Sequence, residues 1–157
     1  MGVVRLSSYS PMDDDPDDYR PTSSWCLHVD PEQRTKLSVI RESIGVGDRI
    51  PRHWHDIDEV VLYERGHARV YLDGVETEVQ GGATVFIPAG AIHGTMNIGD
   101  EPVEIRAVYP STVVRMDLVE RNPMPGTEDH APHASVYDMA TGTFTVLHQT
   151  EGPADLR

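Results

Sequence analysis

The chain has 157 residues and carries 13 Lys and Arg against 26 Asp and Glu, which gives a formal net charge of -13. This length is typical of a single domain with one hydrophobic core. The chain is acidic and has no stripe of basic residues, which binding to a nucleic-acid backbone requires. The negative charge also disfavours binding to anionic lipid. We therefore expect neither a nucleic-acid partner nor a membrane partner.

Residues 1–36 are predicted to form an N-terminal arm that is only partly ordered. The acidic run Asp13-Asp14-Asp15-Pro16-Asp17-Asp18 lies in its first 24 residues, which show no apolar period. Like charges in such a run repel one another, so we interpret this part as a solvated tail. The arm is also a candidate for strand exchange between two copies, because an open sheet edge accepts an added strand.

The start of the chain predicts no export from the cell. It lacks the apolar stretch of a secretory signal, and no run of about 18 apolar residues could span a membrane. Cys26 is the only cysteine, so an internal disulfide is excluded. These features favour a reduced, cytoplasmic compartment.

The central segment, residues 37–118, is predicted to be strand after strand. Apolar or alternating runs separated by Gly, Pro and Asp cover residues 37–44, 60–63, 68–72, 75–80, 83–87, 92–98, 103–109 and 112–118. The pair Asp73-Gly74 predicts a tight hairpin, in which Leu72 lies opposite Val75, Val70 opposite Thr77, and Ala68 opposite Val79. Short strands at this spacing, with little helix, predict an all-β sandwich or barrel.

Residues 119–157 are predicted to be a C-terminal extension. It begins with Asn122-Pro123-Met124-Pro125-Gly126, where proline removes the donors that a sheet ladder needs. Residues 135–139 and 143–148 are expected to add two edge strands.

A set of possible metal ligands lies in the strand region. His53 and His55 are two residues apart, so in a strand both imidazoles leave the same face and can reach one ion. Glu59 follows four residues later, and His93 follows Pro88-Ala89-Gly90. Three imidazoles and one carboxylate suit one divalent transition metal, namely Fe, Mn, Ni, Co or Zn, better than Ca²⁺. A six-coordinate metal with these ligands keeps two open positions, whereas Zn keeps one at most.

The spacing around these ligands resembles the two cupin motifs. The first motif is matched by Gly47, His53-x-His55, Glu59 and Gly66, which are separated by five, three and six residues. The second motif is matched by Gly82, Pro88-x-Gly90, His93 and Asn97, which are separated by five, two and three residues. The sequence is therefore similar to small, single-domain cupins over residues 37–118. This resemblance implies a cupin jelly-roll β-barrel, His53, His55, Glu59 and His93 as metal ligands, and a homodimer.

Strand parity predicts which other side chains line the barrel. If Glu59 faces inward, so does Tyr63, which either orients a substrate, acts as an acid or base near the metal, or is a core tyrosine with a bonded hydroxyl. On the strand of His93, Asn97 is expected to brace the backbone. Arg41 and Arg106 are either anchors for an anionic substrate or surface positions. We expect a mainly apolar pocket for a small organic substrate.

Three classes of function remain open. The first is a dioxygenase-type oxidoreductase, in which the metal centre binds substrate and O₂ together, as the resemblance to cupin dioxygenases implies. The second is a non-redox isomerase, cyclase or lyase that uses the metal as a Lewis acid. The third is a small-molecule binding cupin without turnover. The first is preferred, with a role in bacterial secondary metabolism as the expected setting.

Overall fold

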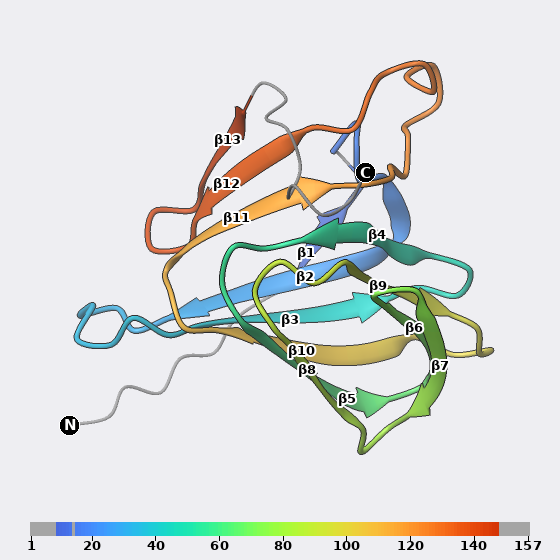
Figure 1. The fold of residues 1–157 in the computed structure, drawn as a ribbon, viewed down its shortest axis with the longest axis horizontal. Coiled ribbons are helices and arrows are strands. Elements are labelled where there is room, and N and C mark those ends of the chain that lie inside the picture. Colours follow the sequence, from blue (N-terminus) through green and yellow to red (C-terminus); the bar gives the residue numbers. More distant parts are fainter. Residues whose placement is uncertain (1–8, 14, 148–157) are drawn as a thin grey trace.

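The computed structural model describes residues 9–13 and 15–147, and within them it consists of strands and loops. Two antiparallel sheets face one another (Figure 1). In spatial order the first contains β1 (Ser10–Met12), β2 (Arg20–Val29), β3 (Ser38–Ile44), β10 (Val103–Tyr109), β5 (Glu59–Arg65) and β8 (Thr84–Ile87). The second contains β13 (Thr143–Leu147), β12 (Ala134–Asp138), β11 (Val113–Leu118), β4 (Arg49–Trp54), β9 (His93–Asn97), β6 (His67–Leu72) and β7 (Val75–Gln80). The predicted all-β jelly roll is confirmed.

The core lies between the two sheets because each strand alternates inward apolar and outward polar positions. Strand β10 shows this alternation most clearly, since Val103, Ile105, Ala107 and Tyr109 are buried and Arg106 between them is exposed. Each large apolar side chain removed from water in this way stabilises the fold by about 1.5–3 kcal/mol relative to an exposed one. In the part of the chain described, no helix is long and apolar enough to cross a membrane.

The hairpin between β6 and β7 has the predicted turn. Asp73 and Gly74 have φ angles of 44° and 89°, and a two-residue turn with both φ values positive matches the twist of the strands beside it. The Asp73 carboxylate also accepts a hydrogen bond of 2.8 Å from the amide of Ile92, at the entry to β9. The register is the predicted one: Leu72 faces Val75, Val70 faces Thr77, and Ala68 faces Val79.

The N-terminal region differs from the sequence-based expectation of a loose arm. Strand β2 pairs with β3 of the same chain from Ser24–Ser43 to Val29–Ser38, and β1 pairs with β2. The edge of β3 is therefore covered within one chain. Exchange of this strand between two copies stays a prediction, as does the homodimer.

The acidic run also differs from the expected solvated tail. Asp18 is only 5% exposed and accepts a hydrogen bond from Arg20, while Asp17 accepts one of 2.6 Å from Arg121 Nε. Buried carboxylates are tolerated when a guanidinium pairs with them, which is why Asp17 and Asp18 pack against the barrel. The expectations for residues 1–8, 14 and 148–157 lie outside the described residues.

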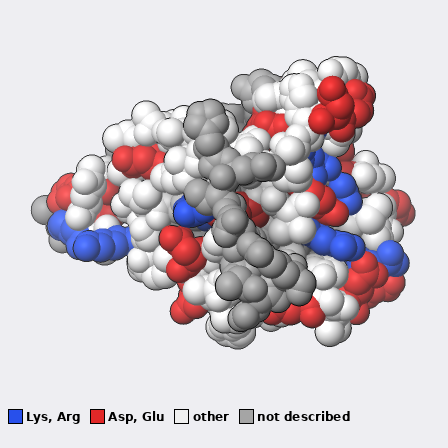
Figure 2. All heavy atoms as spheres, turned by 45° about the horizontal axis from the view of Figure 1, so that its top comes forward, with Lys and Arg blue, Asp and Glu red and all other residues white. Residues whose placement is uncertain are grey.

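The C-terminal extension completes the second sheet. Strand β12 pairs with β11 from Val113–Asp138 to Asp117–Ala134, and β13 lies at the sheet edge beyond β12. On the molecular face shown in Figure 2, acidic side chains form several groups, and small basic groups lie among them.

Candidate metal centre

The fold brings the four predicted ligands together from three strands. His53 lies in β4 opposite His93, the first residue of β9, and Glu59 is the first residue of β5. His55 follows directly after β4 ends. All four side chains are buried, and their ligand atoms lie within 4.8 Å of one another. This group of His53, His55, Glu59 and His93 could hold a metal ion, and we refer to it below as the ligand group.

Backbone carbonyls orient the three imidazoles. Each Nδ1 lies within hydrogen-bond distance of a carbonyl oxygen: His53 with Pro51 at 2.7 Å, His55 with Arg115 at 2.6 Å, and His93 with Ala91 at 2.9 Å. A carbonyl oxygen can only accept, so each Nδ1 carries a proton, and in the neutral imidazole the Nε2 atom then keeps a lone pair. Metal-binding histidines are typically oriented by this kind of bond.

The carboxylate of Glu59 has two different environments. Its Oε1 accepts a hydrogen bond of 2.9 Å from the phenol of Tyr109. Its Oε2 lies 2.8 Å from His93 Nε2 and 3.4 Å from His55 Nε2. These three atoms are buried and satisfied by no hydrogen bond. Two lone pairs facing a carboxylate oxygen need a cation or a proton between them, so the ligand group fits a divalent transition metal.

The protonation states of Glu59 and His53 are those that metal binding requires. Burial alone would raise the pKa of Glu59, but the close imidazoles of His55 and His93 outweigh it and hold the pKa well below its usual value. Burial, helped by the charges of His93 and His55, keeps the pKa of His53 well below the ordinary value of a histidine. An anionic carboxylate and a neutral imidazole are the forms that bind metals.

Tyr63 and Asn97 lie in the barrel interior, as parity predicted. The hydroxyls of Tyr63 and Thr95 share a hydrogen bond of 2.6 Å, and burial raises the pKa of Tyr63 to about 12. Tyr63 therefore stays protonated near neutral pH. Asn97 is 2% exposed and donates to the carbonyl oxygens of Ile44 and Glu101, both at 2.9 Å, so it braces the backbone.

The two arginines considered as substrate anchors lie outside the cavity wall. Arg106 pairs with Glu64 at 2.8 Å, and the guanidinium of Arg41 lies over the ring of Tyr9. Arg20 lines the cavity instead, which sequence reasoning missed because Arg20 follows the acidic run.

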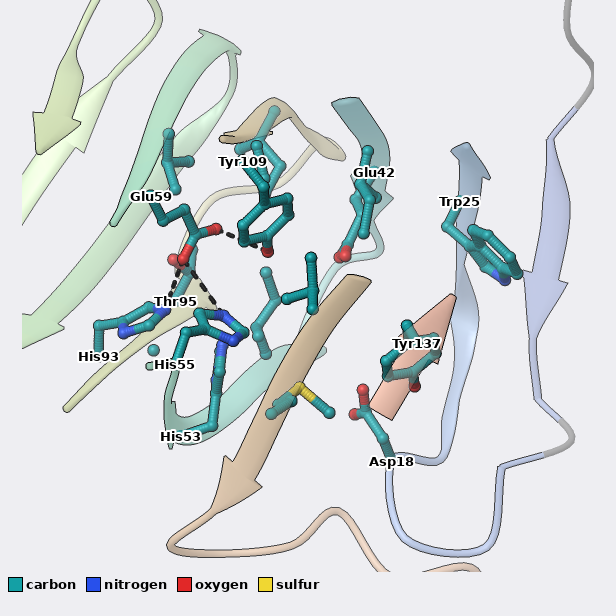
Figure 3. A pocket seen from close by; sticks show the side chains of 18 of the residues that line it. Asp18, Trp25, Glu42, His53, His55, Glu59, His93, Thr95, Tyr109 and Tyr137 are labelled. Atoms are coloured by element: carbon teal, nitrogen blue, oxygen red, sulfur yellow. Dashed lines mark hydrogen bonds and ion pairs between the residues drawn. The ribbon is translucent and has the colours of Figure 1, made fainter. Parts of the chain in front are cut away.

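A cavity of about 420 Å³ opens beside the ligand group (Figure 3). Its volume is in the range of small-molecule sites. Most of the wall is apolar or aromatic, with Trp25, Leu27, Ile40, Ile50, Val61, Val70, Ile105, Val114, Met116, Tyr137, Met139 and Phe144 among its residues. Sequence reasoning gave no role to Tyr109, although alternation along residues 103–109 places it on the inward face with Ile105 and Ala107. It also missed Trp25 and Tyr137.

Comparison with known proteins agrees with this picture. Residues 40–109 match the family model described as cupin domain. An uncharacterized protein of Methanocaldococcus jannaschii is 31% identical over 80 residues, which are 50% of this chain, and the chain spans 64% of that relative's length.

Solved structures extend the likeness to the whole fold. A sugar phosphate isomerase from a cupin superfamily of Silicibacter pomeroyi superposes with a TM-score of 0.64 at 20% identity, covering 97% of this chain and 91% of that chain. The polyketide cyclase RemF of Streptomyces resistomycificus superposes with a TM-score of 0.59 at 20% identity, covering 78% of this chain and 82% of that chain. At this identity the likeness shows a shared fold, and the reaction must be argued from the site.

Proposed function

We propose that this chain, whose residues 40–109 match a cupin domain, is a metal-dependent enzyme of the dioxygenase type, which oxidises a small, largely apolar organic substrate with O₂. The observation that carries the proposal is the buried ligand group, whose unsatisfied nitrogen and oxygen atoms converge at the wall of a mainly apolar cavity. A divalent transition metal held there by His53, His55, Glu59 and His93 would supply two open coordination positions for substrate and O₂.

The surroundings of the ligand group favour oxidation over acid–base chemistry. Proton transfer needs a side chain of suitable pKa within hydrogen-bond reach of the substrate. The two phenols near the ligand group are already bonded, Tyr63 to Thr95 and Tyr109 to Glu59. Burial raises the pKa of both phenols, so neither is a base near neutral pH. Oxidation by O₂ at a metal needs no such side chain; it needs an apolar wall that orients the substrate and excludes water.

A second candidate is a non-redox isomerase, cyclase or lyase. Tyr109 favours it, because its phenol stays protonated and lines the cavity, and it could donate to a substrate oxygen by giving up its hydrogen bond to Glu59. In this case the metal would polarise a carbonyl group, and no O₂ would be consumed. A protein that binds the same molecules without turnover is the remaining alternative.

The test begins with elemental analysis of protein purified without added metal, followed by O₂ uptake on a panel of small aromatic hydroxyketones. We expect about one transition-metal ion per chain and uptake that requires the metal. His93→Ala should abolish both. His67→Ala is the matched control, because His67 is a partly exposed histidine that pairs with Glu78 outside the ligand group.

Each result assigns the function. Turnover of the same panel under argon by metal-loaded protein would favour the second candidate. Ligand-induced stabilisation without product would favour the binding protein. Purified protein that takes up no divalent metal, even when it is offered in excess, would contradict the proposal altogether.

A further inference from the structure

We infer that the end of the cavity remote from the ligand group selects the substrate by charge. It accepts a hydrogen-bond donor on an aromatic ring, either a hydroxyl or an ammonium group, and it repels anions. This inference deepens the proposed function and rests on it for the assumption that the substrate occupies this cavity. The end of the cavity formed by Asp18, Arg20, Trp25, Glu42 and Tyr137 is called the acidic end below.

The acidic end faces the ligand group across the cavity. In Figure 3, Trp25, Tyr137 and Asp18 lie on the side away from His53, His55 and His93, and Glu42 lies between the two groups. A substrate that reaches toward the ligand group with one end therefore places its other end here.

The only guanidinium on the described cavity wall is already bonded to two carboxylates. Arg20 is 2% exposed, and it donates from Nη2 to Asp18 Oδ2 and from Nη1 to Glu42 Oε2, both at 2.8 Å. Asp15 adds a third carboxylate to the same wall. An anionic substrate group would thus meet more negative than positive charge, in a site where burial weakens screening by water.

Two polar groups of the acidic end form no hydrogen bond with the described residues. Glu42 Oε1 accepts no hydrogen bond from the described residues, since Arg20 uses Oε2. The hydroxyl of Tyr137 likewise bonds to no residue within the described part of the chain, and it lines the cavity. Burial, together with the charges of Asp15 and Asp18, raises the pKa of Tyr137, so this hydroxyl stays protonated near neutral pH and can donate a hydrogen bond.

Aromatic side chains surround these polar groups. Trp25 comes from β2, Tyr137 from β12 and Phe144 from β13, and the rings of Tyr137 and Phe144 lie 4.7 Å apart. Flat aromatic walls favour a flat ring in the ligand. All three residues lie outside the matched cupin segment 40–109, whereas the ligand group lies inside it. Of the acidic end, only Glu42 lies inside that segment, so most of this end is a part of the site that the family match does not cover.

The inference can be tested with three probes that share the naphthalene ring system and differ in charge: 2-naphthol, 2-naphthylmethylammonium and 2-naphthoate. Each is titrated calorimetrically into the full chain, as purified and after treatment with a chelator, because a carboxylate could otherwise bind a resident metal. We expect naphthoate to bind the chelator-treated protein at least about tenfold more weakly than the ammonium compound, because one charge contact in a buried site contributes more than this ratio requires. Naphthol should lie between them or match the ammonium compound.

Glu42→Gln keeps an acceptor for Arg20 and removes one negative charge, so it should narrow the ratio between ammonium and naphthoate affinities by about threefold or more. Glu64→Gln is the matched control, because Glu64 lies outside the cavity wall and pairs with Arg106. It should leave the ratio unchanged. Retained naphthol binding shows that Glu42→Gln is folded.

Equal or tighter binding of naphthoate by the chelator-treated protein would overturn the inference, as would equal effects of the two glutamate substitutions or no binding of any probe. Metal content is measured on the same samples. A chain without metal that still selects by charge would contradict the proposed function alone.

Discussion

Tyr109, the last residue of β10, donates a hydrogen bond of 2.9 Å to Glu59 Oε1, at the first residue of the neighbouring strand β5. The bond occupies one carboxylate oxygen and leaves Oε2 facing the imidazoles of His55 and His93. Tyr109 thus positions a predicted metal ligand.

Tyr109→Phe should therefore weaken metal binding while the fold stays intact. Loss of a bond that orients a ligand typically lowers metal affinity by about 10–100-fold. Competition with a chromophoric chelator measures the change. Tyr63→Phe is the control, because the Tyr63 hydroxyl bonds to Thr95 and to no residue of the ligand group. The metal affinity of this variant should stay near that of the wild type. Equal affinity of Tyr109→Phe and wild type would contradict this role.

Three residues of the ligand group could be predicted from local sequence information, whereas His93 was predicted from the spacing of the second motif. His53, His55 and Glu59 lie within one short segment, and strand parity alone places the two imidazoles on one face. The hairpin at Asp73-Gly74 is local in the same sense, since its two residues determine the turn and the turn determines the register.

The N-terminal region could not be predicted, because its partners are distant. Asp17 looks like part of a repelling acidic run until Arg121, 104 residues later, comes to pair with it. Trp25 and Tyr137 belong to the cavity wall for the same reason: β2 and β12 reach the barrel through tertiary pairing that no local pattern encodes. The grouping of the four candidate ligands was thus predictable, and the aromatic wall of the cavity was not.

Removal of His53 should separate metal binding from folding. His53→Ala deletes one imidazole of the ligand group, so added metal should no longer raise the melting temperature of the variant, whereas it should raise that of the wild type. Thermal denaturation with and without stoichiometric metal provides the measurement. A variant that still retained about one metal per chain would show that His53 is not a ligand.

Asn97 is expected to matter for stability and not for the metal. Its side-chain amide bonds to the carbonyls of Ile44 and Glu101 in a buried setting. Asn97→Ala leaves these acceptors unsatisfied and should lower the free energy of unfolding by about 3 kcal/mol. Urea denaturation measures this loss, and elemental analysis should find the metal content unchanged. Loss of metal from a folded Asn97→Ala variant would argue for a role in the site.

Asp15 should make stability depend on pH. Burial, the largest cause, raises its pKa in the folded chain, so the folded state holds the proton more tightly than the unfolded state. The contribution of this carboxyl is then fully present below the unfolded pKa and is lost as pH rises through the folded pKa. Asp15→Asn mimics the neutral form, and it should raise the free energy of unfolding near pH 7 with no gain in acid.

Asp30→Asn provides the opposite sign for comparison. Amide hydrogen bonds, first from Glu32, lower the pKa of Asp30, so its contribution is present near pH 7 and is lost as pH falls through the folded pKa. Urea denaturation of Asp15→Asn and Asp30→Asn, from pH 7 down into the acid range, tests both expectations. A stabilising effect of Asp15→Asn that grew toward acid would contradict the argument.

Arg121 joins the N-terminal region to the C-terminal extension. It is 8% exposed and donates from Nε to Asp17 at 2.6 Å and from Nη1 to the carbonyl of Thr127 at 2.6 Å. Arg121→Ala leaves a carboxylate and several carbonyls without their partner, so it should lower the free energy of unfolding by about 3–5 kcal/mol. Loss of the bond to Asp17 should also loosen residues 15–20, so their amide hydrogens should exchange faster in the variant. Asp18, next to Asp17, lines the cavity, so this segment is part of the cavity wall.

Arg65→Ala is the control for this substitution. Arg65 also pairs with a carboxylate, that of Glu101, but at the exposed surface, where such a pair contributes less than about 1 kcal/mol. Urea denaturation and hydrogen exchange by mass spectrometry separate the two variants. If Arg121→Ala were no more destabilising than Arg65→Ala, and residues 15–20 kept their protection, the pairing of Arg121 with Asp17 would not hold this wall of the cavity in place.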